Sequence, residues 1–233
     1  MKLRFIKESI QLNAFSLAET LIAIGIIGVV SALTIPNLVA KYQKEQTVTK
    51  LKETYSILQQ AFRLSQEDNG DVDSWDTNLS GKEFFDTYLK NYVKYTDIYT
   101  SDELKQKVIW KRLNNTIDIS RTKNDERSTH FSLINGALVS IGGFSYGGKV
   151  VIIDTNGLNL PNIIGKDNFW FFLDSVEGFV PYGYAGAPEE FYGKNNYDRE
   201  MVMQKSCNKN KGGTWCAGVI INDGWKISKD YPW

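Results

Sequence analysis

Residues 15–40 read FSLAETLIAIGIIGVVSALTIPNLVA and decide the fold, because Glu19 is the only charged residue among them. A helix rises about 1.5 Å per residue, so about 20 residues cross the roughly 30 Å hydrocarbon core of a bilayer. The segment has that length and is rich in Leu, Ile and Ala, which favour helices. The sequence therefore predicts one membrane-spanning helix near the N-terminus.

Basic residues before the apolar segment predict its orientation. Lys2, Arg4 and Lys7 outnumber Glu8 in this part of the chain. Positive charge that precedes an apolar segment stays on the cytoplasmic side during insertion. We therefore expect the remainder of the chain to lie outside the cytoplasm.

The apolar segment contains two residues that a simple membrane anchor would not need. An ionisable group such as Glu19 is costly in a membrane unless it finds a partner, which makes it a candidate functional residue. Pro36 removes one helix hydrogen bond and predicts a kink or local melting. Gly25 and Gly28 lower helix propensity but let another helix approach closely.

The stretch Ala14-Phe15-Ser16-Leu17-Ala18-Glu19-Thr20-Leu21 resembles the cleavage and methylation site of type IV prepilins and type II secretion pseudopilins. In that family a prepilin peptidase cuts before an aromatic or aliphatic residue, and a glutamate follows as the fifth residue of the mature chain. The resemblance implies a cut between Ala14 and Phe15, N-methylation of Phe15, and Glu19 as that glutamate. Pro36 falls where many type IV pilins carry a kinking proline, whereas Ala14 replaces the family's usual Gly.

The resemblance, which covers roughly residues 15–62, implies a structural role. The family's glutamate is thought to neutralise the N-terminal amine of a neighbouring subunit, because a paired carboxylate is tolerated in an apolar bundle and a lone one is not. We therefore expect a pilin or pseudopilin, major or minor, of a type IV pilus or type II secretion filament. The implied partners are the prepilin peptidase, other pilin or pseudopilin subunits and the inner-membrane assembly platform. The expected location is the inner membrane, crossed once, and then a filament in the periplasm or at the cell surface.

Simpler interpretations stay open at this point. An ordinary secretory signal has a basic start, an apolar core and a small-residue cut, for which Val30-Ser31-Ala32 is suitable. An uncleaved signal anchor also fits, but neither explains Glu19 and Pro36 together. The alternative function is a membrane-tethered or secreted binding module that recognises DNA, a glycan or a surface.

The hydrophobic pattern divides the chain into four parts. Residues 1–14 are the expected leader, 15–40 the membrane half of a long helix, 41–68 its amphipathic half, and 69–233 the head. In the amphipathic half, apolar residues recur mostly at three- or four-residue spacing and predict one stripe that packs on the head. These residues are Tyr42, Val48, Leu51, Tyr55, Leu58 and Phe62. The helix is expected to stop near Asp68-Asn69-Gly70.

Short helices are predicted in the head. The pattern Ser80-Gly81-Lys82-Glu83 is typical of a capping box and predicts a helix over about 81–93. Another short helix is predicted over 198–205. Residues 96–128 are polar and predicted to be irregular, with a short strand or turn near 108–110.

From residue 129 onward the pattern predicts β-structure. Asn135-Gly136 is typical of a hairpin turn, and Asn222-Asp223-Gly224 predicts a last hairpin between 214–221 and 225–227. The expected strands before that hairpin are 131–133, 137–141, 149–153, 169–173 and 179–180. A long N-terminal helix on a C-terminal antiparallel sheet is an α+β fold, and it resembles the pilin head in architecture.

Cys207 and Cys216 are the only cysteines. In an exported chain two nearby cysteines form a disulfide, whereas in a cytosolic chain they are free thiols. A structural zinc site needs four ligands, which disfavours metal binding by this pair. The expected disulfide also resembles the C-terminal disulfide loop of many type IV pilins.

Residues 154–167 are rich in side-chain oxygens. Calcium favours such ligands, and some pseudopilins bind calcium in a head loop, so Asp154, Asn156 and Asp167 are candidate calcium ligands. Their spacing is not that of an EF-hand. The alternative is a series of Asx turns and a proline turn that links two strands. No other cofactor is expected.

Other functions receive little support from the sequence. The 27 basic and 27 acidic residues balance, which gives no whole-chain reason to expect nucleic acid. Lys205, Lys209 and Lys211 beside Trp215 suit binding of single-stranded DNA, with a solvated loop as the alternative. His130 is the only histidine, and no P-loop, G-x-S-x-G or H-E-x-x-H motif is present. We therefore do not expect an enzyme.

Overall fold

The computed structural model describes residues 16–76, 78–118, 128–145, 148–174, 178–182 and 198–233. Two compact units make up the chain, Met1–Gln43 and Lys44–Trp233. Helix α1 (Leu17–Asn69) begins in the first unit and ends in the second. It ends next to Gly70, whose φ of +79° is a helix-terminating conformation that glycine adopts readily, so the predicted stop is confirmed.

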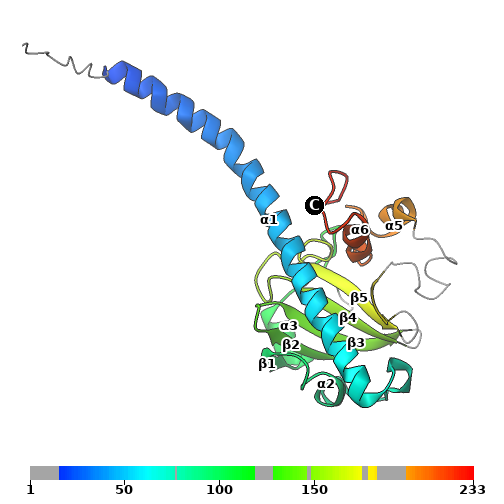
Figure 1. The fold of residues 1–233 in the computed structure, drawn as a ribbon. Coiled ribbons are helices and arrows are strands. Elements are labelled where there is room, and N and C mark those ends of the chain that lie inside the picture. Colours follow the sequence, from blue (N-terminus) through cyan, green and yellow to red (C-terminus); the bar gives the residue numbers. More distant parts are fainter. Residues whose placement is uncertain (1–15, 77, 119–127, 146–147, 175–177, 183–197) are drawn as a thin grey trace, which may run out of the picture. The chain divides into compact units, whose positions relative to one another are not determined.

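The second unit is built on a six-stranded sheet with the order β1-β2-β3-β4-β5-β6 (Figure 1). Each strand pairs antiparallel with the strand that follows it in the chain. The strands are β1 (Tyr95–Tyr99), β2 (Thr129–Leu133), β3 (Leu138–Ser145), β4 (Gly148–Asp154), β5 (Asn168–Asp174) and β6 (Gly178–Pro181). Gly136, with φ +85°, forms the predicted turn between β2 and β3. The predicted α+β fold is confirmed.

The main core lies between one face of the sheet and the second half of α1. Alternate strand residues point to the same face, and Phe131, Val151 and Phe171 are completely buried there. They share one cluster of buried residues with Leu51 and Leu58 of α1. Burying these large side chains is the main driving force for this packing, at about 25 cal/mol per Å² of apolar surface.

The predicted apolar stripe of α1 is confirmed within the second unit. Tyr55 is partly buried and stacks on the ring of Phe179 at 5.1 Å between centroids. Tyr42 is 62% exposed and belongs to the first unit, so it is not part of this core. The buried members of the stripe are Val48, Leu51, Leu58 and Phe62.

Two short helices start where the sequence predicts. Helix α2 (Gly81–Tyr88) begins with the predicted capping box, in which Ser80 and Glu83 satisfy each other's backbone N–H groups. Helix α5 (Arg199–Lys205) follows Asp198, whose side chain accepts a hydrogen bond from the Met201 N–H. A single 3₁₀ turn, η1 (Val72–Ser74), follows α1.

The prediction that residues 96–128 are irregular is wrong at its start. Strand β1 lies there, and helix α3 (Ser101–Lys107) follows it with a capping box between Thr100 and Glu103. A second buried cluster joins Leu104, Val108 and Trp110 to Leu138 of β3. Because Leu138 alternates with Val139 of the main core, this cluster lies on the face of the sheet opposite α1.

The predicted last hairpin is wrong. Residues Cys216–Asn222 form helix α6, and the chain from 223 to 233 contains no strand. The first five residues of α6 are all buried. A short helix buried on all sides has no amphipathic period, so its sequence resembles that of a buried strand.

Candidate functional site

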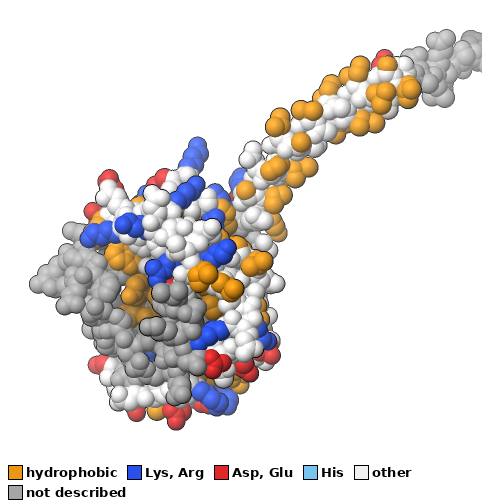
Figure 2. Space-filling model, turned by 180° about the vertical axis from the view of Figure 1, so that it is seen from behind, with side chains coloured by type: hydrophobic (Ala, Val, Ile, Leu, Met, Phe, Trp, Pro, Cys, Tyr) orange, Lys and Arg blue, Asp and Glu red, His pale blue; other side chains and the backbone are white. Residues whose placement is uncertain are grey.

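The first part of α1 carries an exposed apolar surface. The large apolar side chains from Leu17 to Val39 have exposed fractions between 46% and 79%, and Figure 2 shows them (orange) along the helix. In the part of the chain that the structure describes, α1 is the one helix long and apolar enough to cross a membrane. Apart from the neighbouring helix backbone, no atom lies within 4 Å of the place where a Cβ at Gly25 or Gly28 would be.

Glu19 helps to cap the N-terminus of α1. The Ser16 backbone N–H donates to Glu19 Oε2 at 2.9 Å, and the Glu19 N–H donates to Ser16 Oγ at 3.2 Å. This reciprocal pair is a capping box, which satisfies two backbone donors that a helix start leaves open. Sequence reasoning assigned Glu19 to subunit pairing and missed this local role, although the Ser-x-x-Glu spacing indicates it.

Pro36 does not interrupt the helix. The helical assignment continues through it from Leu17 to Asn69, so the predicted local melting is not found. Thr34 Oγ1 donates to the Val30 carbonyl at 2.8 Å one turn earlier. The predicted leader, residues 1–14, and the predicted cut between Ala14 and Phe15 lie outside the described residues.

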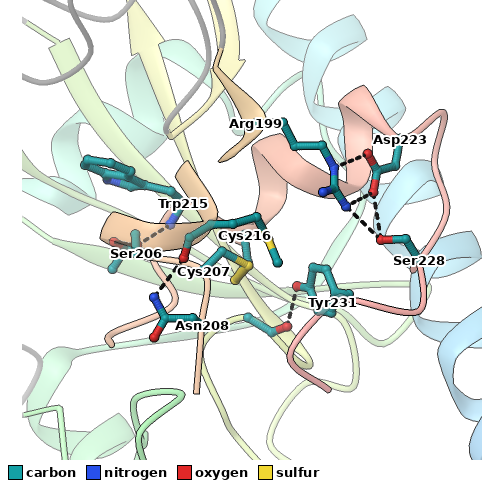
Figure 3. Close-up of a disulfide and its surroundings, with 12 residues drawn as sticks. Arg199, Ser206, Cys207, Asn208, Trp215, Cys216, Asp223, Ser228 and Tyr231 are labelled. Atoms are coloured by element: carbon teal, nitrogen blue, oxygen red, sulfur yellow. Dashed lines mark hydrogen bonds and ion pairs between the residues drawn. A yellow bond between two sulfur atoms is a disulfide. The ribbon is translucent and has the colours of Figure 1, made fainter. Parts of the chain in front are cut away.

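The predicted disulfide is confirmed. Cys207 and Cys216 are joined and both are completely buried. The bond connects the segment after α5 to the first residue of α6 (Figure 3). Cross-linking a loop this short stabilises a fold by about 2–3 kcal/mol in the chain-entropy model.

The loop enclosed by the disulfide is held against a second loop. The Leu113 N–H donates to the Gly212 carbonyl at 3.1 Å, and the Asn114 N–H donates to the Lys211 carbonyl at 3.0 Å. Gly213 fits tightly there, because a Cβ at this position would lie 2.7 Å from the Ile164 carbonyl oxygen. The backbone of this region is therefore fixed by neighbours on both sides.

The predicted nucleic-acid residues lie on and next to this fixed loop. The side chains of Lys205, Lys209 and Lys211 are exposed. Trp215 is partly buried, and its backbone N–H donates to Ser206 Oγ at 3.1 Å. The three lysines offer positive charge to solvent, while Trp215 presents only part of its ring.

In the predicted calcium loop, the carboxylate of Asp167 accepts hydrogen bonds from other residues of the same loop. Asp167 accepts from the N–H groups of Asn162 at 2.7 Å and Ile163 at 2.6 Å, and from Asn156 Nδ2 at 3.2 Å. These donors fix the turn around Pro161. Burial raises the pKa of the Asp167 carboxyl above its usual range.

Asp154 also accepts hydrogen bonds. Its Oδ2 accepts from Trp110 Nε1 and from Asn168 Nδ2, both at 3.3 Å. The side-chain oxygens of Asn156, Asn162 and Asn168 are buried without a hydrogen-bond donor in the described residues. No group of three or more His, Cys, Asp or Glu gathers among the residues that the structure describes. Calcium binding by this loop stays a prediction.

His130 is held between two hydroxyl groups. Its Nδ1 lies 2.8 Å from Ser140 Oγ, and its Nε2 lies 3.1 Å from Ser101 Oγ. The ring of His130 in β2 thus contacts α3 through Nε2 and β3 through Nδ1. This arrangement suits a structural role for the histidine.

An ion-pair network that sequence reasoning missed lies beside the disulfide (Figure 3). Arg199 binds Asp223 and Asp230, both at 2.7 Å, and its Nη2 also donates to Ser228 Oγ at 2.9 Å. Its hydrogen bonds hold the pKa of the Asp223 and Asp230 carboxyls below their usual range. The partners are about 24 and 31 residues from Arg199 along the chain, and no local sequence pattern indicates such pairing.

Comparison with known proteins assigns most of the chain to one family. No curated protein and no solved structure matches it. A family model described as "Family of unknown function (DUF6613)" matches residues 37–233, which begin directly after Pro36 and include the whole second unit. Because the match covers well over half of the chain, the protein belongs to the DUF6613 family.

Proposed function

We propose that the protein is a membrane-anchored structural subunit of pilin or pseudopilin type, which assembles into a type IV pilus or type II secretion filament. The observation that carries the proposal is the exposed apolar surface of α1 from Leu17 to Val39. Exposed apolar surface of this extent is unfavourable in water. Lipid before assembly and neighbouring helices after it are environments that would cover this surface.

The head supports an extracytoplasmic location. Disulfides persist in oxidising compartments and are rare in the cytosol, and the bond between Cys207 and Cys216 is buried within the core. The basic residues before the apolar segment favour the same orientation. The inner membrane is therefore the proposed starting location, with the head outside the cytoplasm.

Processing and partners follow from the resemblance to prepilins. In the proposal, a prepilin peptidase cuts between Ala14 and Phe15, and Phe15 is N-methylated. The inner-membrane assembly platform then transfers the subunit from lipid into a filament of pilin or pseudopilin subunits. Glu19 pairs with the N-terminal amine of a neighbour, because an unpaired carboxylate in an apolar bundle is strongly unfavourable.

The test must separate the charge of Glu19 from its capping role. Glu19→Gln keeps a side-chain oxygen that accepts from the Ser16 N–H but removes the charge, whereas Ser16→Ala removes one half of the capping box and keeps the charge. We expect Glu19→Gln to insert into the membrane normally and to be lost from sheared filaments. Ser16→Ala should be incorporated at close to the wild-type level.

Each result has a distinct meaning. Incorporation of Glu19→Gln at the wild-type level, with loss of Ser16→Ala, would show that Glu19 serves the helix start and not subunit pairing. A wild-type chain that stays in the membrane and never enters a filament would favour the alternative function, a tethered binding module. Immunoblots of the membrane and filament fractions measure both outcomes.

A further inference from the structure

Two tryptophans of the C-terminal segment lie under lysines of α1. Lys44 Nζ lies 5.9 Å from the ring centroid of Trp233, and Lys52 Nζ lies 5.9 Å from that of Trp225. These distances are within the range of cation–π attraction. Both rings are partly buried and pack against the main core. We call these four residues the Trp–Lys surface.

The C-terminal segment is fixed firmly enough to hold Trp233 in place. Tyr231 is buried, and its hydroxyl donates to the Gly165 carbonyl at 2.5 Å. The Trp233 N–H donates to the Tyr231 carbonyl at 2.8 Å. Asp230, between Lys229 and Tyr231, is bound by Arg199. The position of Trp233 is thus set by a buried anchor and an ion pair.

Positive charge dominates around the Trp–Lys surface. In residues 44–53 there are three lysines and two glutamates, and in residues 225–233 two lysines and one aspartate. That aspartate, Asp230, shares Arg199 with Asp223, so these three groups together carry one net negative charge. Lys226 and Lys229 are exposed. The surface therefore suits an anionic partner.

The length of chain between the apolar segment and this surface points to the identity of that partner. Lys44 follows Ala40 by four residues of the continuous helix α1, a rise of about 6 Å at 1.5 Å per residue. The headgroup layer adds roughly 5–8 Å on each side of the hydrocarbon core. If the apolar segment spans a bilayer, Lys44 is within reach of lipid headgroups whatever the angle between the two units. Trp and Lys are also the residues that favour this layer.

We infer that the Trp–Lys surface rests on the headgroup layer and binds the phosphate groups of anionic phospholipids. Trp233 inserts its ring at the headgroup level, and Lys44 contacts the phosphate. The inference rests on the membrane anchoring in the proposed function and adds a lipid-binding surface on the head. Such a surface would hold the head against the bilayer until the subunit leaves for a filament.

The experiment uses the full chain at one copy per nanodisc, which excludes neighbouring subunits. Discs contain phosphatidylcholine alone or with phosphatidylglycerol, and lipids brominated near the headgroup quench nearby tryptophans. The quenched fraction attributable to Trp233 is the difference between wild type and Trp233→Phe. Trp75→Phe is the matched control, because Trp75 is only 3% exposed and stacks on Tyr88 inside the head.

We expect Trp233→Phe to lose at least about half of the bromolipid quenching, and Trp75→Phe to lose almost none. The quenching should rise severalfold with phosphatidylglycerol and fall with added salt, as expected for lysine–phosphate attraction. Lys44→Gln should remove the phosphatidylglycerol effect, and Lys44→Arg should restore it.

Equal quenching of wild type and Trp233→Phe in discs that contain the inserted chain would overturn the inference and leave the anchoring intact. Quenching that is the same with and without phosphatidylglycerol, and the same in wild type and Lys44→Gln, would overturn the phosphate contact. A chain that is not retained in the discs would instead contradict the proposed function.

Discussion

Arg199 binds Asp223 through two parallel hydrogen bonds, from Nε to Oδ1 at 2.7 Å and from Nη2 to Oδ2 at 2.8 Å. The same guanidinium holds Asp230. It therefore ties the start of α5 to the end of α6 and to the segment that positions Trp233. Planar bidentate pairing of this kind is specific to arginine, because lysine is a point charge on a flexible chain.

Arg199→Ala should reduce the stability of the head. Asp223 is largely buried, with 15% of its side chain exposed, and loses its charged partner in the variant. Hydrogen bonds to charged groups contribute about 1.5–3 kcal/mol, and the partial exposure of Arg199 places the expected loss near the lower end. Arg199→Lys should recover only a part of it. Denaturant unfolding of the full chain in detergent measures the difference, and equal stability of all three proteins would contradict the role of the network.

The same network predicts a pH dependence. Arg199 lowers the folded-state pKa of the Asp223 and Asp230 carboxyls, so its stabilisation is fully present above the unfolded pKa of about 3.9 and is lost as the pH falls below it. The stability difference between wild type and Arg199→Ala should therefore be constant near neutral pH and shrink below about pH 4. Thermal midpoints across this range test the direction. A difference that grows on acidification would contradict it.

Gly213→Ala should destabilise the disulfide region more than Gly224→Ala does. Both glycines have positive φ, +87° and +74°, and an alanine in that conformation costs about 1–2 kcal/mol. A Cβ at Gly213 would also lie 2.7 Å from the Ile164 oxygen, whereas at Gly224 nothing lies within 4 Å. Gly224→Ala is therefore the control for backbone strain alone. Equal unfolding midpoints for the two variants would show that the close contact has no energetic effect.

Calcium should not stabilise the head. Asp154 Oδ2 and both carboxylate oxygens of Asp167 already accept N–H donors, so a cation bound to these oxygens would have to displace them. We expect the thermal midpoint in excess calcium and in chelator to agree within about 1 °C, since a ligand that does not bind adds no stability. A saturable rise with calcium that disappears in Asp154→Asn would show that the loop is a calcium site after all.

The features predicted correctly from sequence are encoded by neighbouring residues. Asn135-Gly136 sets a turn, Ser80 and Glu83 cap a helix, and short apolar runs bounded by turn residues mark β2 to β5. The Thr100-x-x-Glu103 capping box, missed in the sequence, was readable by the same rule. Its helix was overlooked because the surrounding stretch is polar.

The features that the sequence did not reveal depend on residues far apart in the chain. Arg199 meets Asp223 and Asp230 only after α5 and α6 have packed together. Helix α6 was mistaken for a strand because burial on all sides removes its helical period. Two of the three donors to the Asp167 carboxylate are backbone N–H groups, whose positions composition alone does not predict.

The central claim, a prepilin-type subunit, is tested most directly by mass spectrometry of the mature protein purified from the membranes of the cells that produce it. The account predicts a chain that begins at Phe15 and carries one methyl group on its N-terminal amine. A chain that retains Met1, or one that begins after Ala32 as an ordinary signal cut would leave it, would contradict the account.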